Sequence, residues 1–214
     1  LDLKVRETYS DFLLREGLKE KLRAQRLEML DRNPRHTPSL LSLAKLELEE
    51  DDMEGASEYF EKALSTAYND PKIHRDVGLI YLENGKREKA VELLTTAAFL
   101  DPEDSRTLIA LAALAEEDND LEKAEEMLKL ALDASPADRD ILGMLASLYK
   151  RTDRDYEASQ MLEQITAIDP SDVNNQINLA ILYMEMEDTA GLDRLQERAP
   201  RQVNQKLTFY TDYG

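Results

Sequence analysis

The sequence predicts an all-α solenoid built from antiparallel helix pairs. Prolines recur with a period of 34 residues at Pro102, Pro136 and Pro170, and Pro34 lies two periods before Pro102. Only seven glycines and seven prolines occur in 214 residues, too few for the many tight turns of a β-rich fold. Self-similarity at a fixed period of about 20–50 residues is the signature of repeat architectures, so the period decides the fold class.

Small side chains recur at three positions of the same period. The three sets are Ala44, Gly78, Ala112, Ala146 and Ala180; Ala56, Ala90, Ala124 and Ala158; and Ala63, Ala97 and Ala131. Around them, apolar residues recur at helical spacing, as in Leu108 and Leu111 of one segment and Leu121 and Leu128 of the next. The distance between packed helices depends on the side chains at their contact, so these sets predict closely packed pairs.

A turn is predicted between the two helices of each pair. Asp51, Gly85, Asn119 and Asp153 fall between the first two sets of small residues, and Gly17 lies one period before Asp51. Glycine, asparagine and aspartate tolerate the left-handed backbone conformation that ends many helices. Each proline of the period is then expected to end a second helix, because proline cannot donate the helical hydrogen bond.

Residues 37–190 are predicted to hold tandem 34-residue helix–turn–helix repeats. Their predicted bounds are 37–70, 71–104, 105–138 and 139–172, with a partial repeat from 173. Residues 1–36 are predicted to form a degenerate N-terminal helical repeat or a cap. Residues 191–214 are predicted to form a C-terminal capping helix or a truncated further repeat, because the ends of a solenoid need a polar outer face.

This pattern resembles the tetratricopeptide repeat (TPR) family. Segment 105–136, SRTLIALAALAEEDNDLEKAEEMLKLALDASP, and segment 71–102, PKIHRDVGLIYLENGKREKAVELLTTAAFLDP, match its small–aromatic–small–proline pattern. Two departures occur: Tyr68 replaces an expected proline, and the large aromatic position of the first helix holds Leu40, His74, Leu108, Leu142 and Gln176. The resemblance implies a right-handed superhelix that contacts its ligands through the inner face of the first helices.

The charge of the chain excludes some partners. Lys and Arg number 27 against 45 Asp and Glu, a formal net charge of −18 at pH 7, which disfavours nucleic acid and anionic membranes and favours a basic partner surface. The longest apolar run, Leu108–Ala115, is far shorter than the roughly 20 residues of a membrane-spanning helix, so no direct membrane insertion is expected. The chain is expected to be soluble, in the cytoplasm or as a soluble part of a larger or processed protein.

No catalytic centre, cofactor or metal site is predicted. The only two histidines, His36 and His74, lie in different repeats, and His74 occupies a packing position between helices. Asp118, Asp120 and Glu122 alternate as in a calcium loop, but a lysine follows where that loop needs glycine. A turn and a helix N-terminus, which favours acids, explain these residues. The chain is therefore not expected to be an enzyme.

The resemblance places a peptide-binding groove along a second stripe of each first helix. The stripe contains Leu41, Lys45 and Leu48; Arg75, Leu79 and Leu82; Ile109, Ala113 and Glu116; Met144, Ser147 and Lys150; and Ile177, Ile181 and Met184. Exposed contiguous apolar surface usually marks a partner site, although neighbouring first helices or the terminal segment are alternative covers for it. An apolar groove with acidic rims predicts an amphipathic or extended segment with apolar anchors and basic flanks.

The predicted function is that of a non-catalytic scaffold or adaptor that recognises a segment of another protein. Three alternatives stay open: a holding chaperone for secreted or assembling subunits, the recognition domain of a larger multidomain protein, and self-association through the terminal repeats. Suppressed aggregation of several unrelated clients would indicate the chaperone, whereas a single tight partner would indicate the adaptor.

Overall fold

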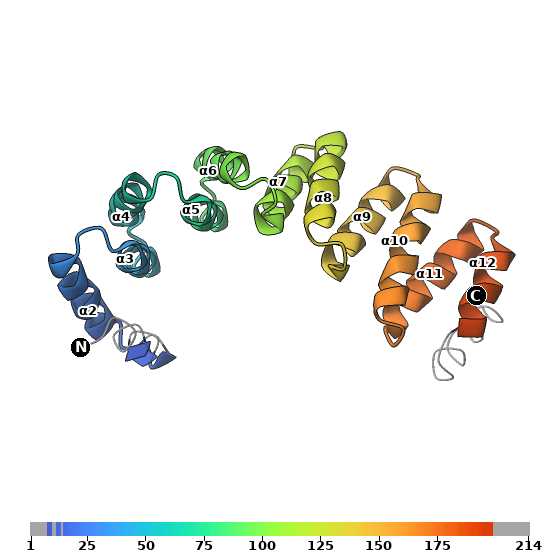
Figure 1. Cartoon of the computed structure of the whole chain (residues 1–214), viewed down its shortest axis with the longest axis horizontal. Coiled ribbons are helices and arrows are strands. Elements are labelled where there is room, and N and C mark those ends of the chain that lie inside the picture. The colour runs from blue at the N-terminus through green and yellow to red at the C-terminus, as the bar shows by residue number, and fades with distance from the viewer. Residues whose placement is uncertain (1–7, 10–11, 14, 199–214) are drawn as a thin grey trace. The chain divides into compact units, whose positions relative to one another are not determined.

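The computed structural model describes residues 8–9, 12–13 and 15–198 of the chain (Figure 1). The regular elements of this part are α-helices, and no strand occurs among the described residues. The predicted all-α fold is therefore confirmed. Residues 199–214, which include most of the predicted C-terminal cap or further repeat, lie outside the described part.

The chain divides into two compact units, Leu1–Asp101 and Pro102–Gly214. The first unit contains α2 (Lys19–Arg32), α3 (Thr37–Glu49), α4 (Met53–Thr66), α5 (Pro71–Glu83) and α6 (Arg87–Leu100). The second contains α7 (Ser105–Glu117), α8 (Leu121–Ala134), α9 (Arg139–Arg151), α10 (Asp155–Ile168), α11 (Val173–Glu185) and α12 (Thr189–Arg198).

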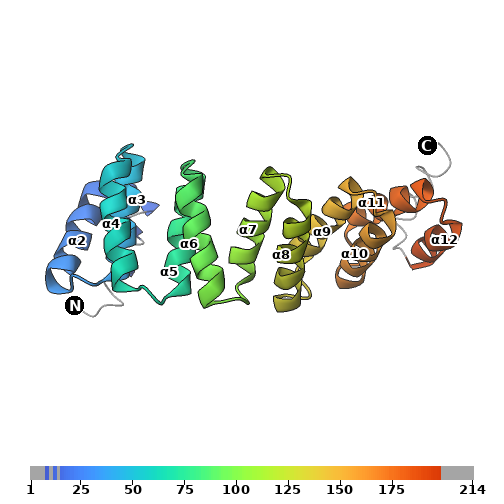
Figure 2. The ribbon, with the colours of Figure 1, turned by 90° about the horizontal axis from the view of Figure 1, so that it is seen from above.

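Consecutive helices pack as pairs inside each unit. In the first unit α3 packs against α4 and α5 against α6, which Figure 2 shows side by side, and in the second α7 packs against α8 and α9 against α10. The first helices of the pairs begin at Thr37, Pro71, Ser105, Arg139 and Val173, one period apart. How the two terminal segments divide into caps and further repeats stays a prediction.

The turns inside the pairs adopt the left-handed backbone conformation. The φ angle is 60° at Asp51, 69° at Gly85, 58° at Asn119 and 55° at Asp153, and it is 66° at Gly17. The turn positions predicted from the period are thus confirmed. The turn residue of each pair directly follows the C-cap of the first helix, a position where the left-handed conformation is common.

Glu187 also adopts this conformation, with a φ of 56°, one period after Asp153. A side chain with a Cβ costs about 1 kcal/mol or more there, so we expect Glu187→Gly to stabilise the fold. The free energy of unfolding should rise by about 0.5 kcal/mol. The rise is smaller than the relieved strain because glycine also increases the conformational entropy of the unfolded chain. Urea unfolding followed by circular dichroism measures this change as a higher midpoint.

The control for this prediction is Gly85→Ala at the equivalent turn. A Cβ added at Gly85 meets no heavy atom within 4 Å, so the substitution changes only the backbone preference. It should lower the free energy of unfolding by about 1 kcal/mol. Unchanged midpoints in both variants would show that the left-handed turns carry no strain.

Aspartates begin several of the helices. The side chain of Asp52 accepts a hydrogen bond from the Gly55 amide at 2.9 Å, and that of Asp120 accepts one from the Lys123 amide at 3.1 Å. These bonds satisfy amides that have no partner inside the helix. The acids at 118–122 are therefore a turn and a helix cap, as the sequence predicts.

The first unit has its core around Phe60, which is fully buried between α4 and α5. Its ring meets that of Tyr81 edge to face, with the ring centroids 5.2 Å apart. Small residues bring the helices together: a Cβ added at Gly78 would lie only 3.0 Å from Leu94 Cγ. His74 is buried and its Nδ1 lies 3.0 Å from the Asp70 carbonyl oxygen, a packing role that matches the prediction.

The second unit has two core clusters. One centres on Ala124, Leu128 and Leu145, from α8 and α9, and the other joins Leu179 and Tyr183 of α11 to α12. Both clusters are almost wholly aliphatic, in line with the small number of aromatic residues in the chain. Two of the cavities described next are lined by helices of this unit, one by α9, α10 and α11 and the other by α10, α11 and α12.

Candidate functional site

In the first unit, a groove of about 580 Å³ lies between α3 and α5. We call it the α3–α5 groove. Its apolar lining consists of Leu41, Leu48, Leu79 and Ile80. Leu41 and Leu48 share one face of α3 with Lys45, because side chains three or four residues apart are neighbours on a helix. The groove thus offers accessible aliphatic surface along two first helices.

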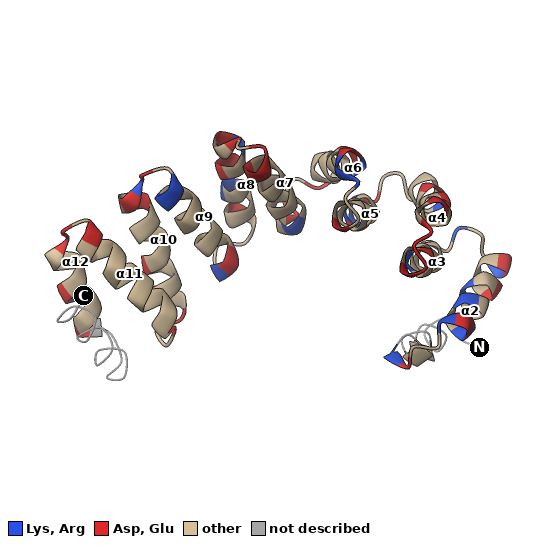
Figure 3. Ribbon diagram, turned by 180° about the vertical axis from the view of Figure 1, so that it is seen from behind, with Lys and Arg blue, Asp and Glu red and all other residues tan. Residues whose placement is uncertain are grey.

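Acidic residues outnumber basic ones at this groove. Its charged lining consists of Lys45, Glu49, Asp76 and Glu83, and Figure 3 shows further acidic residues on α3 and α4. Lys45 forms no ion pair with any residue that the structure describes. Asp76 accepts a hydrogen bond from the Arg75 guanidinium at 2.9 Å. The groove therefore carries a net negative charge next to its apolar lining.

In the second unit, a groove of about 560 Å³ lies between α9 and α11, with α10 contributing part of its lining. We call it the α9–α11 groove. Its apolar side chains are Ala146, Ala158, Leu162, Ile165, Ile181 and Leu182, and its charged ones are Arg139, Lys150, Asp140, Asp172 and Glu185. Gly143 also lines it, and a Cβ added there would meet no heavy atom within 4 Å. The groove is therefore open at this point of α9.

The structure leaves every one of the predicted stripe residues at least partly exposed. Lys45, Ala113, Met144, Ser147, Lys150, Ile181 and Met184 are exposed, and Leu41, Leu48, Arg75, Leu79, Leu82, Ile109, Glu116 and Ile177 are half-buried. Leu41, Lys45, Leu48 and Leu79 meet in the α3–α5 groove, and Ser147, Lys150 and Ile181 meet in the α9–α11 groove.

The remaining stripe residues line neither groove. They are Arg75, Leu82, Ile109, Ala113, Glu116, Met144, Ile177 and Met184. Leu82, Ile109 and Ile177 pack against the core clusters of their own units. An aspartate at these three positions would therefore disturb the fold as well as any ligand contact, so they are poor positions for testing binding.

Two charged stripe residues of the second unit, Lys150 and Glu116, already have partners within the chain. Lys150 Nζ lies 2.6 Å from Glu185 of α11 and 3.0 Å from Asp155 of α10, and its hydrogen bonds to these carboxylates raise the pKa of Lys150. Glu116 of α7 pairs with Arg151 of α9 in the same way. These side chains connect neighbouring first helices, a role that the sequence did not reveal.

Several groove residues lie outside the predicted stripe, among them Gly143, Asn174 and Asn178. Asn174 and Asn178 each precede a predicted stripe residue by three positions on α11, so they share its face. Gly143 precedes Ser147 by one helical turn. A prediction that also included the residues three or four positions before each stripe residue would have contained all three.

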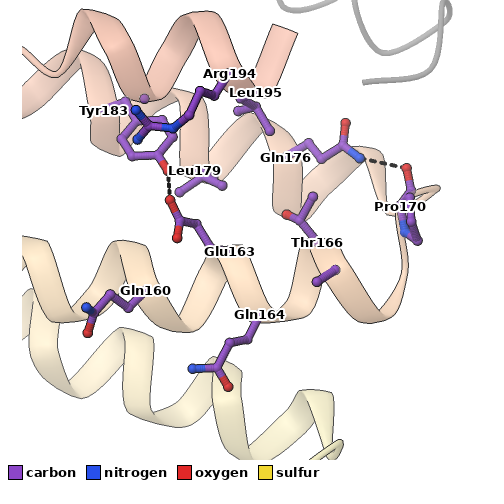
Figure 4. Close-up of a pocket in the computed structure, with 12 residues that line it drawn as sticks. Gln160, Glu163, Gln164, Thr166, Pro170, Gln176, Leu179, Tyr183, Arg194 and Leu195 are labelled. Carbon is purple, nitrogen blue, oxygen red and sulfur yellow. Dashed lines mark hydrogen bonds between the residues drawn. The ribbon is translucent and has the colours of Figure 1, made fainter. Parts of the chain in front are cut away.

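A third cavity, of about 820 Å³, lies among α10, α11 and α12 (Figure 4). We call it the α10–α12 pocket. None of the predicted stripe residues lines it. The Tyr183 hydroxyl donates a hydrogen bond to the Glu163 carboxylate at its edge, and burial together with that bond raises the pKa of Tyr183. Gln176 and Pro170 close the opposite end.

In the described ranges, no group of three or more His, Cys, Asp or Glu side chains is arranged to hold a metal ion. No helix of the described part is long and apolar enough to cross a membrane. His36 Nδ1 lies 2.8 Å from the Ser39 hydroxyl, and the ring is buried.

Solved structures share this fold at low sequence identity. The chain is 18% identical to pilF of Pseudomonas aeruginosa, with a TM-score of 0.68 and 98% of each chain covered. It is 14% identical to PilW, a type IV pilus biogenesis factor, with a TM-score of 0.62 and coverage of 99% of this chain and 94% of that chain. For the C-terminal part of a TPR repeat-containing protein from Cytophaga hutchinsonii, identity is 12%, the TM-score is 0.70, and 95% and 80% of the two chains are covered.

Such identities show the fold alone, a TPR solenoid. No curated protein matches the chain. The model of one family, described as the middle TPR-like domain of cilia and flagella-associated protein 70, matches residues 43–203, which is most of the sequence. The resemblance found in the repeat pattern is thereby confirmed, and the chain belongs to the family of this TPR-like domain.

Proposed function

We propose that the chain is a non-catalytic interaction scaffold or adaptor that binds a peptide or helical segment of another protein in its grooves. The observation that carries this proposal is the composition of the α3–α5 and α9–α11 grooves, each of which combines accessible aliphatic side chains with acidic neighbours. Apolar surface rimmed by polar residues is typical of partner sites.

The charges of the grooves favour a particular kind of partner segment. In the α3–α5 groove, Lys45 is outnumbered by Glu49, Asp76 and Glu83. In the α9–α11 groove, Lys150 is already engaged by Glu185 and Asp155. A segment with apolar anchors and flanking Lys or Arg would complement both, whereas nucleic acid would be repelled by the net charge of −18.

Gly143→Gln tests the α9–α11 groove directly. The new side chain enters the open groove, and glycine is a poor helix former, so the helix itself should gain stability from the change. Peptides selected from a displayed library of ten-residue sequences should carry basic flanks and bind this variant at least tenfold more weakly than the parent chain. Titration calorimetry with the selected peptides measures the loss.

Gly143→Ala is the matched control, because its single methyl group leaves most of the groove free. It should bind the same peptides as the parent does. Equal affinity of all selected peptides for the parent and the Gly143→Gln variant would refute binding in this groove. Circular dichroism of both variants checks that helix content is unchanged.

Exposed aromatic side chains favour one alternative, the holding chaperone. Phe99 is 82% exposed, Tyr68 69% and Tyr156 65%. PilW, which has the same fold, is a pilus biogenesis factor, so a role in holding partly folded subunits is a second candidate for this chain. Binding of several unrelated unfolded proteins with no dependence on Gly143 would favour this function over the adaptor.

The family name favours a second alternative. Because the family is described as a middle domain, the chain is also a candidate for the recognition domain of a larger protein. In that case the grooves would serve the same purpose, and the catalytic or structural partner domain would lie elsewhere in the protein.

A further inference from the structure

The charged residues of the α9–α11 groove are confined to its two ends. On α9, no charged residue occurs between Asp140 and Lys150, and on α11 none occurs between Asp172, just before the helix, and Glu185 (Figure 3). The lining residues between these ends are uncharged. A ligand that lies along the groove therefore meets charge at its own two ends and not in its middle.

The first end of the groove, where α9 and α11 begin, carries more acid than base. Arg139 Nη1 lies 2.7 Å from the Asp169 carboxylate and 3.7 Å from that of Asp172. The Asp140 carboxylate is exposed and forms no ion pair with any residue that the structure describes. This end therefore keeps a negative charge that is free to meet a base of a ligand.

The second end, where α9 and α11 finish, is also negative. The base that lines it, Lys150, lies between two acids, with Glu185 at 2.6 Å and Asp155 at 3.0 Å. Because two carboxylates share one ammonium group, their charge is only partly compensated. A base of a ligand is therefore attracted to this end as well.

The distance between the two ends sets the spacing of bases in a ligand. At a rise of about 1.5 Å per residue, the helix is about 15 Å long from Asp140 to Lys150, and the stretch from Asp172 to Glu185 is about 20 Å long. An extended segment covers such a distance with about five or six residues, at roughly 3.3 Å each. A helical segment needs about ten to thirteen residues. The two conformations thus predict different spacings of the bases.

The middle of the groove favours the extended conformation. Asn174 and Asn178 are exposed on α11, and their side-chain amides form no hydrogen bond with any described residue. Each amide can donate and accept, as a peptide group does. The two residues lie about 6 Å apart along the helix axis, close to the roughly 6.6 Å between alternate residues of an extended chain. A helical segment offers few free peptide groups, because its own turns use them.

The opposite wall of the groove lets a main chain come close to these amides. Lys150 and Glu185 show that an offset of 35 residues brings side chains of α9 and α11 together, and the same offset relates Gly143 to Asn178. A Cβ at Gly143 would meet no heavy atom within 4 Å, and Ser147, one turn further along, is small as well. A segment can therefore lie against α9 and still reach the amides of α11.

We propose that the α9–α11 groove binds an extended segment of a partner protein whose Lys or Arg residues stand about five or six positions apart, with uncharged residues between them. One base meets Asp140, and the other meets Glu185 and Asp155. The amides of Asn174 and Asn178 form hydrogen bonds with the main chain between the two bases. This binding mode rests on the proposed function, because it specifies the segment that the same groove takes.

Two displayed libraries of fourteen-residue peptides test the spacing. Both fix two lysines and randomise the other positions among uncharged residues, with the lysines six positions apart in one library and eleven in the other. The parent chain should select binders from the first library, and these should lose at least tenfold in affinity for Gly143→Gln. Moving one lysine of a selected peptide to the wider spacing should weaken binding about two- to fivefold, the usual contribution of an exposed ion pair.

Substitutions in the chain test the individual contacts. Asn174→Ala combined with Asn178→Ala should weaken all selected peptides about tenfold, because two main-chain hydrogen bonds are lost while the helix is retained. Asp140→Asn should weaken them about two- to fivefold. Replacing one of the two peptide lysines by glutamine should abolish the effect of Asp140→Asn, and replacing the other should not. Gln160→Ala, on α10 outside this groove, is the control and should leave binding unchanged.

Each other outcome contradicts the proposal. Peptides that depend on Gly143 but prefer the wider spacing, or show no preference, would overturn the extended segment and leave the proposed function standing. Unchanged affinity after the substitution of Asn174 and Asn178 would overturn the main-chain contacts in the same way. If neither library yields binders that depend on Gly143, binding in this groove is refuted, and the proposed function fails there together with this inference.

Discussion

Phe60→Ala is expected to lower the free energy of unfolding of the first unit by about 3–5 kcal/mol. The Phe60 side chain is fully buried, and it packs among Ala44, Ala56 and Ala90. Alanines at these positions are too small to fill the space that the ring leaves, so a cavity should remain. The edge-to-face contact with Tyr81, at 5.2 Å between ring centroids, is lost as well.

Hydrogen exchange locates this effect within the chain. Amides of α3–α6 should lose protection, because a repeat protein transmits stability mainly between neighbouring pairs. Amides of α9–α11 should keep theirs, since their core clusters contain no residue of the first unit. Phe99→Ala is the matched control: that ring is 82% exposed, and its removal should change stability by less than about 0.5 kcal/mol. Equal loss of protection in both units would contradict local propagation.

Much of the fold could be predicted because its determinants are local and repeated. The turn residues Asp51, Asn119 and Asp153 are types that tolerate left-handed backbone, and each stands at the same position of the period. Glu187 was missed because glutamate does not signal such a turn, although its position in the period does. At Glu187 the repeat period indicates a left-handed turn and the residue type does not. The period is the better predictor of the turn there, because the packing of the helix pair requires it.

The candidate site was harder to predict. Some stripe residues of α3 and α9 line the two grooves, because helical spacing decides which side chains share a face, and ligand binding by the stripe stays a prediction. Its charged members were assigned to a ligand, yet Lys150 pairs with Glu185 and Glu116 with Arg151, each 35 residues away along the chain. A separation of 35 residues is one period plus one residue. In both pairs, this offset brings the two side chains together on successive first helices.

The α10–α12 pocket could not be predicted from the pattern at all. The polar residue at position 176 is visible in the sequence. The hydrogen bond that its amide nitrogen donates depends on where the Pro170 carbonyl lies in the folded chain. Cavities arise from the three-dimensional fit of helices, and a period in the sequence does not encode that fit. A polar residue at a packing position is nevertheless a signal that deserves a structural check.

Gly191→Ala is expected to destabilise the second unit by about 1–3 kcal/mol, although alanine is the better helix former. A Cβ added at Gly191 in α12 would lie 2.7 Å from Cε1 of Tyr183 and 2.5 Å from the Asp188 carboxylate. The Tyr183 ring is only 3% exposed and its hydroxyl is held by Glu163, so it has little room to move. Asp188 is engaged too, because it accepts the Gly191 amide at 2.8 Å.

Gly143→Ala in α9 provides the comparison for this prediction, since the same methyl group is added to a helix in the same unit. There it meets open space, and the free energy of unfolding should rise by up to about 1 kcal/mol. Urea unfolding followed by circular dichroism should therefore move the two midpoints in opposite directions. A stabilised Gly191→Ala variant would mean that α12 can shift away from Tyr183 at no cost, and the close contact between α11 and α12 would then not be needed for the stability of this end of the chain.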